Sequence, residues 1–230
     1  MKYLLLLLFL PLTVLPQSRF DSAEALFKQK NFVQAKPMFQ EYLRSNPNHL
    51  MTLEYLGDIY GQEKKWDDAI SYYQRLIELK PSVANYHYKF GGVSGMLAKE
   101  SNKFKALGMI GDIRSSFEKA IELDPKHIDA RWALIELYLQ LPAIVGGSES
   151  KAKLYANQLI KISPVDGYLA HGHIEEYLKR YSAAELNYKK AVDISGSPMT
   201  YKKLADLYKK MNQPAKAKAT LALSNQKNKN

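Results

Sequence analysis

The sequence contains no cysteine. Disulfides, cysteine-ligated metal sites and a thiol nucleophile are therefore excluded. A bacterial lipoprotein anchor is excluded too, because it needs a cysteine at the cleavage site. The few histidines are scattered, and the closest pair, His171 and His173, has a spacing that does not share a helix face. No Ser/His/Asp set, carboxylate pair or metal-ligand cluster stands at a meaningful spacing, so the sequence indicates no enzyme, metal or cofactor.

The N-terminus lacks an A-x-A cleavage sequence but otherwise has the pattern of a secretory signal. Lys2 supplies the charged start, and an apolar run covers residues 4–10 and continues past Pro11. This run is too short for a comfortable transmembrane helix. We therefore expect a signal peptide at residues 1–18 and export to the periplasm or beyond. The alternative is an uncleaved signal that anchors the chain in the inner membrane.

The formal charge of +10 is concentrated at one end of the chain. Residues 197–230 hold eight lysines and one aspartate. The simplest interpretation is a solvated terminal helix face. The alternative is peripheral contact of the Lys-rich C-terminus with an anionic membrane or an acidic partner. Nucleic acid is not expected as a partner of an exported chain.

Three segments end in the same way, as the last turn of an amphipathic helix closed by Pro47, Pro81 or Pro125. Proline cannot continue a helix, and it pushes the residue before it out of the helical region. Pro47 and Pro81 are 34 residues apart. Because a fixed period of this length indicates a repeat architecture, we expect stacked helix pairs.

Between these two prolines, small residues and large residues alternate on the inner faces of two predicted helices. Gly57 and Ala69 are small, which lets two antiparallel helices approach closely, and Tyr60, Trp66 and Tyr73 fill the space around them. This order resembles the tetratricopeptide-repeat (TPR) signature. The same pattern predicts repeat-packing residues along the chain: Ala23, Ala35, Gly57, Tyr60, Trp66, Ala69, Tyr73, Tyr138, Ala152, Gly172, Ala184, Ala205, Tyr208 and Ala217.

The resemblance implies an all-α solenoid of about six antiparallel helix hairpins in a right-handed superhelix, because one hairpin cannot bury its own apolar face. A disordered basic tail is expected at 224–230. The expected repeats cover residues 19–49, 50–83, 84–127, 128–166, 167–197 and 198–223.

Three repeats depart from the pattern. The third carries about ten extra residues, so we expect both of its helices to be lengthened, with Ser101 as the N-cap of the second. Its first helix contains three glycines within Gly91–Gly95, which indicates either close helix packing or access for a partner. The fourth repeat carries about five extra residues in a loop from Pro142. In the fifth, Glu175 stands where an aromatic residue is usual.

The resemblance also implies a concave groove that binds extended peptides or partner helices. The Lys and Asn set that holds a peptide's terminal carboxylate in chaperone-binding TPR domains is absent here. The first helices instead place these residues in the groove: Glu54, Asp58, Tyr88, Trp132, Glu136, His173, Lys202 and Asp206. Phe20, Glu24, Gly92 and Leu169 hold the remaining inward positions. For Tyr88 and Trp132 the alternative is packing between repeats. We therefore expect a non-catalytic protein- or peptide-binding scaffold of the bacterial envelope, with a membrane-associated structural protein as the alternative.

Overall fold

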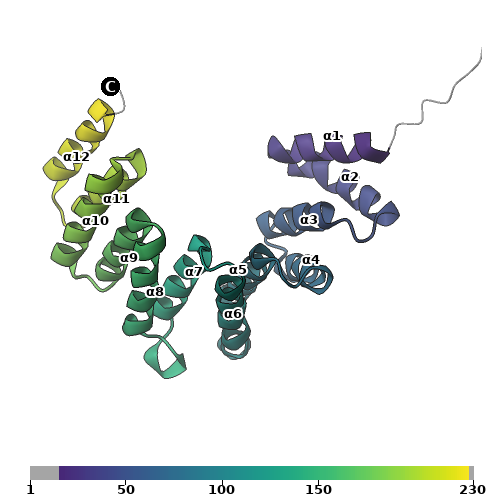
Figure 1. Ribbon diagram of the computed structural model, residues 1–230, viewed down its shortest axis with the longest axis horizontal. Coiled ribbons are helices and arrows are strands. Elements are labelled where there is room, and N and C mark those ends of the chain that lie inside the picture. The colour runs from purple at the N-terminus through teal and green to yellow at the C-terminus, as the bar shows by residue number, and fades with distance from the viewer. Residues whose placement is uncertain (1–15, 228–230) are drawn as a thin grey trace, which may run out of the picture. The chain divides into compact units, whose positions relative to one another are not determined.

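The computed structural model describes residues 16–227, which form twelve α-helices and one short 3-10 helix (η1), with no β-strand among them (Figure 1). The predicted all-α fold is confirmed. The predicted signal peptide lies outside the described residues except for 16–18, which begin the first helix. The helices are α1 (Pro16–Lys28), α2 (Phe32–Ser45), α3 (Leu50–Gln62), α4 (Trp66–Leu79), α5 (Ala84–Glu100), α6 (Lys103–Leu123), α7 (Ile128–Gln140), η1 (Ala143–Val145), α8 (Glu149–Ile162), α9 (Pro164–Tyr177), α10 (Tyr181–Ser195), α11 (Pro198–Lys210) and α12 (Pro214–Lys227).

The chain divides into two compact units between Lys80 and Pro81. The first unit holds the hairpins α1–α2 and α3–α4, and the second holds the four hairpins from α5–α6 to α11–α12. Within each unit, every helix contacts the next one along the chain. The predicted six helix pairs are thus present. No helix between Pro16 and Lys227 has the length and apolar character needed to cross a membrane.

Close approach within the hairpins depends on a glycine that faces an aromatic ring. A Cβ atom on Gly172 would lie 2.3 Å from the ring of Tyr188, a side chain that is almost fully buried. A Cβ atom on Gly57 would lie 2.9 Å from the ring of Tyr73. Contacts this short are repulsive, so glycine is needed at these positions for the ring of one helix to approach the backbone of the other so closely.

The predicted repeat-packing residues lie in the interior of the two units. Tyr60 is half-buried, with its ring stacked on Tyr72 at a centroid distance of 5.4 Å. The other thirteen are buried. The small ones face large side chains of the partner helix, as native packing density requires.

The turn between the two helices of a hairpin carries a left-handed residue in four of the repeats. These residues have φ between 56° and 60°, and none is glycine: Lys30, Lys64, Lys179 and Asn212. A side chain in this region of φ and ψ clashes with its own backbone, at a cost of roughly 1–2 kcal/mol. Of the hairpins that carry the extra residues, the third connects its helices without a left-handed residue, and the fourth uses a glycine, Gly146, with φ of 102°.

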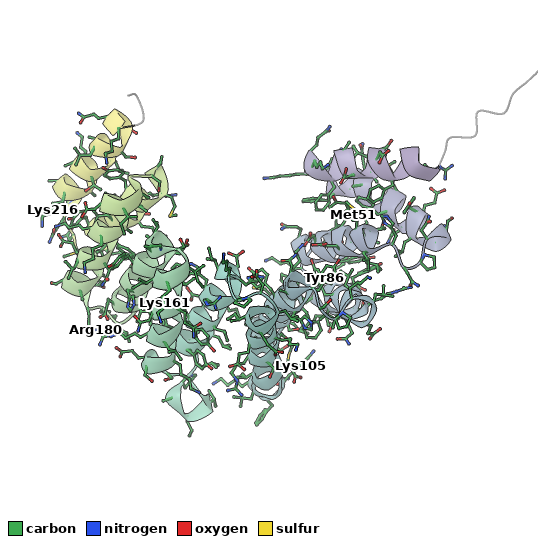
Figure 2. The ribbon with its side chains drawn as sticks, in the orientation of Figure 1. Met51, Tyr86, Lys105, Lys161, Arg180 and Lys216 are labelled. Carbon is green, nitrogen blue, oxygen red and sulfur yellow. The ribbon has the colours of Figure 1, made fainter. Side chains whose placement is uncertain are left out.

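The fifth repeat replaces apolar packing with a network of charges. Glu175 on α9 is buried, with 8% of its surface exposed. Its carboxylate lies 2.9 Å from Lys153 Nζ and 2.5 Å from Arg180 Nε, and both cations also pair with Glu149 on α8. Arg180, labelled in Figure 2, stands in the turn between α9 and α10. A buried carboxylate is tolerated only when it is paired in this way, so this network replaces the missing aromatic residue.

Three boundaries differ from the predictions. Ser101 ends α5, and the N-cap of α6 is Asn102, whose side chain accepts a hydrogen bond from the Lys105 amide at 3.0 Å. Pro164, inside the expected fourth repeat of residues 128–166, already starts α9 of the fifth hairpin, where proline is tolerated because the first turn of a helix needs no amide donor. Residues 224–227 were expected to be disordered, but α12 continues through Lys227 and Ser224 is buried.

The substitution Gly172→Ala tests the contact between glycine and ring. The added methyl group meets the buried Tyr188 ring, so we expect the free energy of unfolding to fall by about 1–3 kcal/mol. Gly111→Ala is the matched control, because nothing lies within 4 Å of a Cβ atom there. It should raise the free energy of unfolding by up to about 1 kcal/mol through helix propensity. Urea denaturation followed by circular dichroism measures both, and equal effects of the two substitutions contradict the assignment.

The substitution Lys64→Gly tests the strain in the turns. Glycine adopts positive φ without a clash, so we expect a gain of roughly 0.5–1 kcal/mol in the free energy of unfolding. In the control Lys80→Gly, φ is −145°. At this φ glycine relieves no clash and only increases the conformational entropy of the unfolded chain. The free energy of unfolding should therefore fall by about 0.4–1 kcal/mol. Thermal denaturation distinguishes the two, and a loss of stability in Lys64→Gly means that the turn is unstrained.

Candidate functional site

Of the two predicted groove residues of the first unit, Asp58 takes part in hydrogen bonding within its own hairpin. Glu54 and Asp58 lie one turn apart on α3, and both are half-buried. The Tyr73 hydroxyl donates a hydrogen bond to Asp58 Oδ1 at 2.5 Å. Burial, together with this carboxylate, raises the pKa of Tyr73. Asp58 thus orients a core tyrosine of α4.

Tyr88 and Trp132 pack between repeats, the alternative left open above. The Tyr88 ring lies 6.0 Å from Phe117 and 5.0 Å from His127, which caps α7. Trp132 packs against two hydrophobic clusters, and its Nε1 donates a hydrogen bond to Asp166 Oδ1 at 3.3 Å. Both side chains remain half-buried. They hold α7 against its neighbours and leave only part of each ring accessible.

Glu136 and His173 meet across α7 and α9. His173 Nε2 lies 2.6 Å from Glu136 Oε1, and Gln140 Nε2 donates a hydrogen bond to Glu136 Oε2 at 2.9 Å. The imidazole lowers the pKa of Glu136, and burial opposes it. The Trp132 ring lies 6.1 Å from the His173 ring. The structure therefore brings Trp132, Glu136 and His173 together, as one group on two adjacent repeats.

The remaining predicted positions have different surroundings. On α11, Lys202 is exposed and Asp206 pairs with Lys209 at 2.8 Å. Phe20 and Leu169 are buried in hydrophobic clusters, so their expected groove position is wrong. Phe20 packs against Phe39 and Tyr42 of α2 and Tyr55 of α3, and Leu169 belongs to a cluster with residues of α10 and α11, which the family position alone did not indicate.

An apolar pocket of about 600 Å³ lies between α5, α6, α7 and η1, within the second unit. Two of the inward positions, Gly92 and Glu136, line it. Its walls are mostly aliphatic. Among the residues that line it are Gly95, Met96, Lys99, Lys103, Leu107 and Ile110.

The glycines of α5 have two different roles. A Cβ atom on Gly91 would lie 2.9 Å from the Phe117 ring, so Gly91 allows close helix packing. Nothing lies within 4 Å of a Cβ atom on Gly92 or Gly95, and both line the pocket. Each glycine in a helix costs roughly 1 kcal/mol relative to alanine. At Gly92 and Gly95 no packing contact requires that cost, and the missing side chains leave the pocket open.

Large apolar side chains are exposed beside this pocket. Phe104 on α6 is 89% exposed and Ile144 in η1 is 93% exposed. Leu107 and Met96, which line the pocket, are 46% and 39% exposed. Clustered exposure of this kind marks a contact surface rather than a neutral one.

The sequence indicated this region only through the extra residues of the third and fourth repeats. The spacing predicted that both helices of the third repeat are lengthened, and α5 and α6 do have 17 and 21 residues. It could not show that Leu107 and Ile110 would line an open pocket. Among the residues from 16 to 227, no group of three or more His, Asp or Glu side chains is placed to hold a metal ion.

Two segments match models of the tetratricopeptide repeat, residues 20–84 and residues 165–198. The second match covers the fifth repeat, where Glu175 departs from the pattern. No curated protein matches the sequence.

Several solved structures share the fold at low sequence identity. TTC0263, a thermophilic TPR protein of Thermus thermophilus, is 15% identical with a TM-score of 0.62, over 90% of this chain and 99% of that one. PilW, a widely conserved type IV pilus biogenesis factor, is 15% identical with a TM-score of 0.65, over 89% and 90% of the two chains. YrrB, described as a TPR protein with an unusual peptide-binding site, is 15% identical with a TM-score of 0.55, over 80% and 88%. The chain thus has the all-α TPR fold, and two of its segments match tetratricopeptide-repeat models.

Proposed function

We propose that this chain is a non-catalytic scaffold of the bacterial envelope that binds protein or peptide partners through the second unit. The apolar pocket between α5, α6 and α7 carries the proposal, because a folded chain gains nothing from leaving an apolar hollow open to water. The fold supports it as well. YrrB has the same fold and is described as having a peptide-binding site, and PilW has it and is described as a pilus biogenesis factor.

The envelope part of the proposal depends on the N-terminal sequence. Lys2 and the apolar run over residues 4–10 have the order of a secretory signal. A membrane-associated role is the second candidate. It is favoured by the exposed lysines of the last hairpin: Lys202, Lys203, Lys209, Lys210, Lys216 and Lys218.

Crosslinking in the native organism tests the binding function. A photoreactive amino acid at Met96 or Lys202 should give discrete crosslinked proteins, because both side chains are exposed on the second unit. The same group at Ile194, which is exposed on α10 and not among the residues lining the pocket, should give none or a weak background. Tyr88 and Trp132 are poor probes, since both pack between repeats. Absence of any crosslinked protein from Met96, Leu107 and Lys202 would contradict a binding scaffold.

N-terminal sequencing of the native protein tests the location. A cleaved signal should leave a chain that starts near residue 19, recovered in the soluble periplasmic fraction. An intact Met1 in the membrane fraction would favour the anchored alternative. A salt wash distinguishes a chain anchored by its signal from one docked by its exposed lysines. Salt should release only the docked chain, because the attraction of exposed charges is screened within roughly 10 Å at 0.1 M salt.

A further inference from the structure

The third hairpin is longer than its neighbours. α5 and α6 have 17 and 21 residues, whereas α7 and α8, the next hairpin, have 13 and 14. α6 is seven residues longer than α8, which adds about 10 Å to its length at 1.5 Å per residue. In a solenoid each hairpin covers the apolar face of the one before it. The next hairpin ends too early to cover the extension, and the pocket lies where that cover is missing.

The uncovered part of the extension is apolar. Met96 on α5 and Leu107 on α6 line the pocket and are partly exposed, and Ile110 lies one turn after Leu107. Ile144, which is 93% exposed, precedes Val145, and Val145 lines the pocket. This surface extends beyond the pocket itself, so a single acyl chain in the pocket would leave part of it exposed.

The walls of the pocket determine what kind of chain segment fits. α5, α6 and α7 satisfy their backbone groups within each helix, so they offer no edge to which an extended peptide could bond. An extended segment pressed against these walls would bury unpaired amide and carbonyl groups, at a cost. A helix pairs its own backbone groups and presents only side chains. The walls therefore favour a helical segment with apolar residues on one face.

The rim of the pocket determines the charge of the partner. Lys99 and Lys103 line it and are exposed. Glu136 is the one acidic residue among the residues that line it. Its carboxylate lies 2.6 Å from His173 Nε2 and also interacts with the charge of Lys99, so the two lysines leave the lining with a net positive charge. The rim is thus basic. A second copy of this chain, with its formal charge of +10, is poorly matched to it.

We propose that this pocket binds an amphipathic helix of a partner protein, whose apolar face fills the space beside Gly92 and Gly95 and whose flanking acidic residues pair with Lys99 and Lys103. This proposal rests on the proposed function and names the class of partner. It places the binding site at the lengthened third hairpin rather than along the whole concave face.

Two designed peptides of 18 residues test the proposal. They share one apolar face of Leu and Phe at helical spacing and differ only in their flanking charges, Glu in one and Lys in the other. Fluorescence anisotropy with the full chain should show binding of the acidic peptide at least tenfold tighter than that of the basic one. Equal binding of the two peptides, or preference for the basic peptide, overturns the proposal.

Substitutions locate the site. Gly95→Leu adds a side chain in the lining of the pocket, at a position where nothing lies within 4 Å of a Cβ atom. It should weaken binding of the acidic peptide at least tenfold. Gly108→Leu adds the same side chain to α6, at an exposed position that is not among the residues lining the pocket, and should change binding less than threefold. Equal effects of the two substitutions overturn the proposal, and thermal denaturation confirms that both variants fold.

Charge reversal tests the rim. Lys99→Glu with Lys103→Glu should weaken binding of the acidic peptide about tenfold, because two attractive contacts become repulsive. Lys126→Glu with Lys161→Glu makes the same change in net charge at exposed positions that are not among the residues lining the pocket, and should have little effect. Dodecanoate is the probe for an acyl chain. If it binds and the acidic peptide does not, the pocket belongs to a lipid and the proposal is overturned. Loss of peptide binding with crosslinks still formed at Lys202 would overturn this inference alone and leave the scaffold function intact.

Discussion

The structure depends on how closely the two helices of a hairpin approach each other. A hairpin has only two layers, so it gains a dry interior only if the rings of one helix lie directly on the backbone of the other. Glycine at Gly57, Gly91 and Gly172 permits this contact with Tyr73, Phe117 and Tyr188. The buried faces of neighbouring hairpins then stack into clusters of apolar side chains within each unit.

Polar groups are accommodated by pairing them inside this thin architecture. The hydroxyls of Tyr55, Tyr73, Tyr188 and Tyr208 each donate to a carboxylate of another helix, at 2.5–2.9 Å. A tyrosine can therefore fill the interior with its ring while its hydroxyl stays bonded near the surface. The abundance of tyrosine over phenylalanine follows from this geometry. The buried carboxylate of Glu175 is also paired, in this case with the side chains of Lys153 and Arg180.

The proposed binding site lies where the repeat is irregular. A regular repeat hides its apolar face under the next one, so it offers partners mainly polar side chains. The lengthened α5–α6 hairpin breaks this rule and leaves Met96, Leu107 and their neighbours facing a hollow. The basic rim at Lys99 and Lys103 adds charge selectivity to an otherwise non-directional apolar contact.

The sequence alone determined the helix pairs, because small and aromatic residues recur at positions that only a stacked hairpin can use. Ala69, Tyr73 and Gly57 were correctly placed in the interior from their spacing. The groove could be predicted only in part. Trp132, Glu136 and His173 do come together, but Phe20 and Leu169 turn into the core.

Only the tertiary structure decided what the extra residues do. From the sequence, Gly91, Gly92 and Gly95 are alike, and all could serve close packing. The structure separates them, because Gly91 meets Phe117 while Gly92 and Gly95 face open space. Local spacing specifies which helices form, but whether a helix face is covered depends on the length of its neighbour, and that comparison exists only in three dimensions.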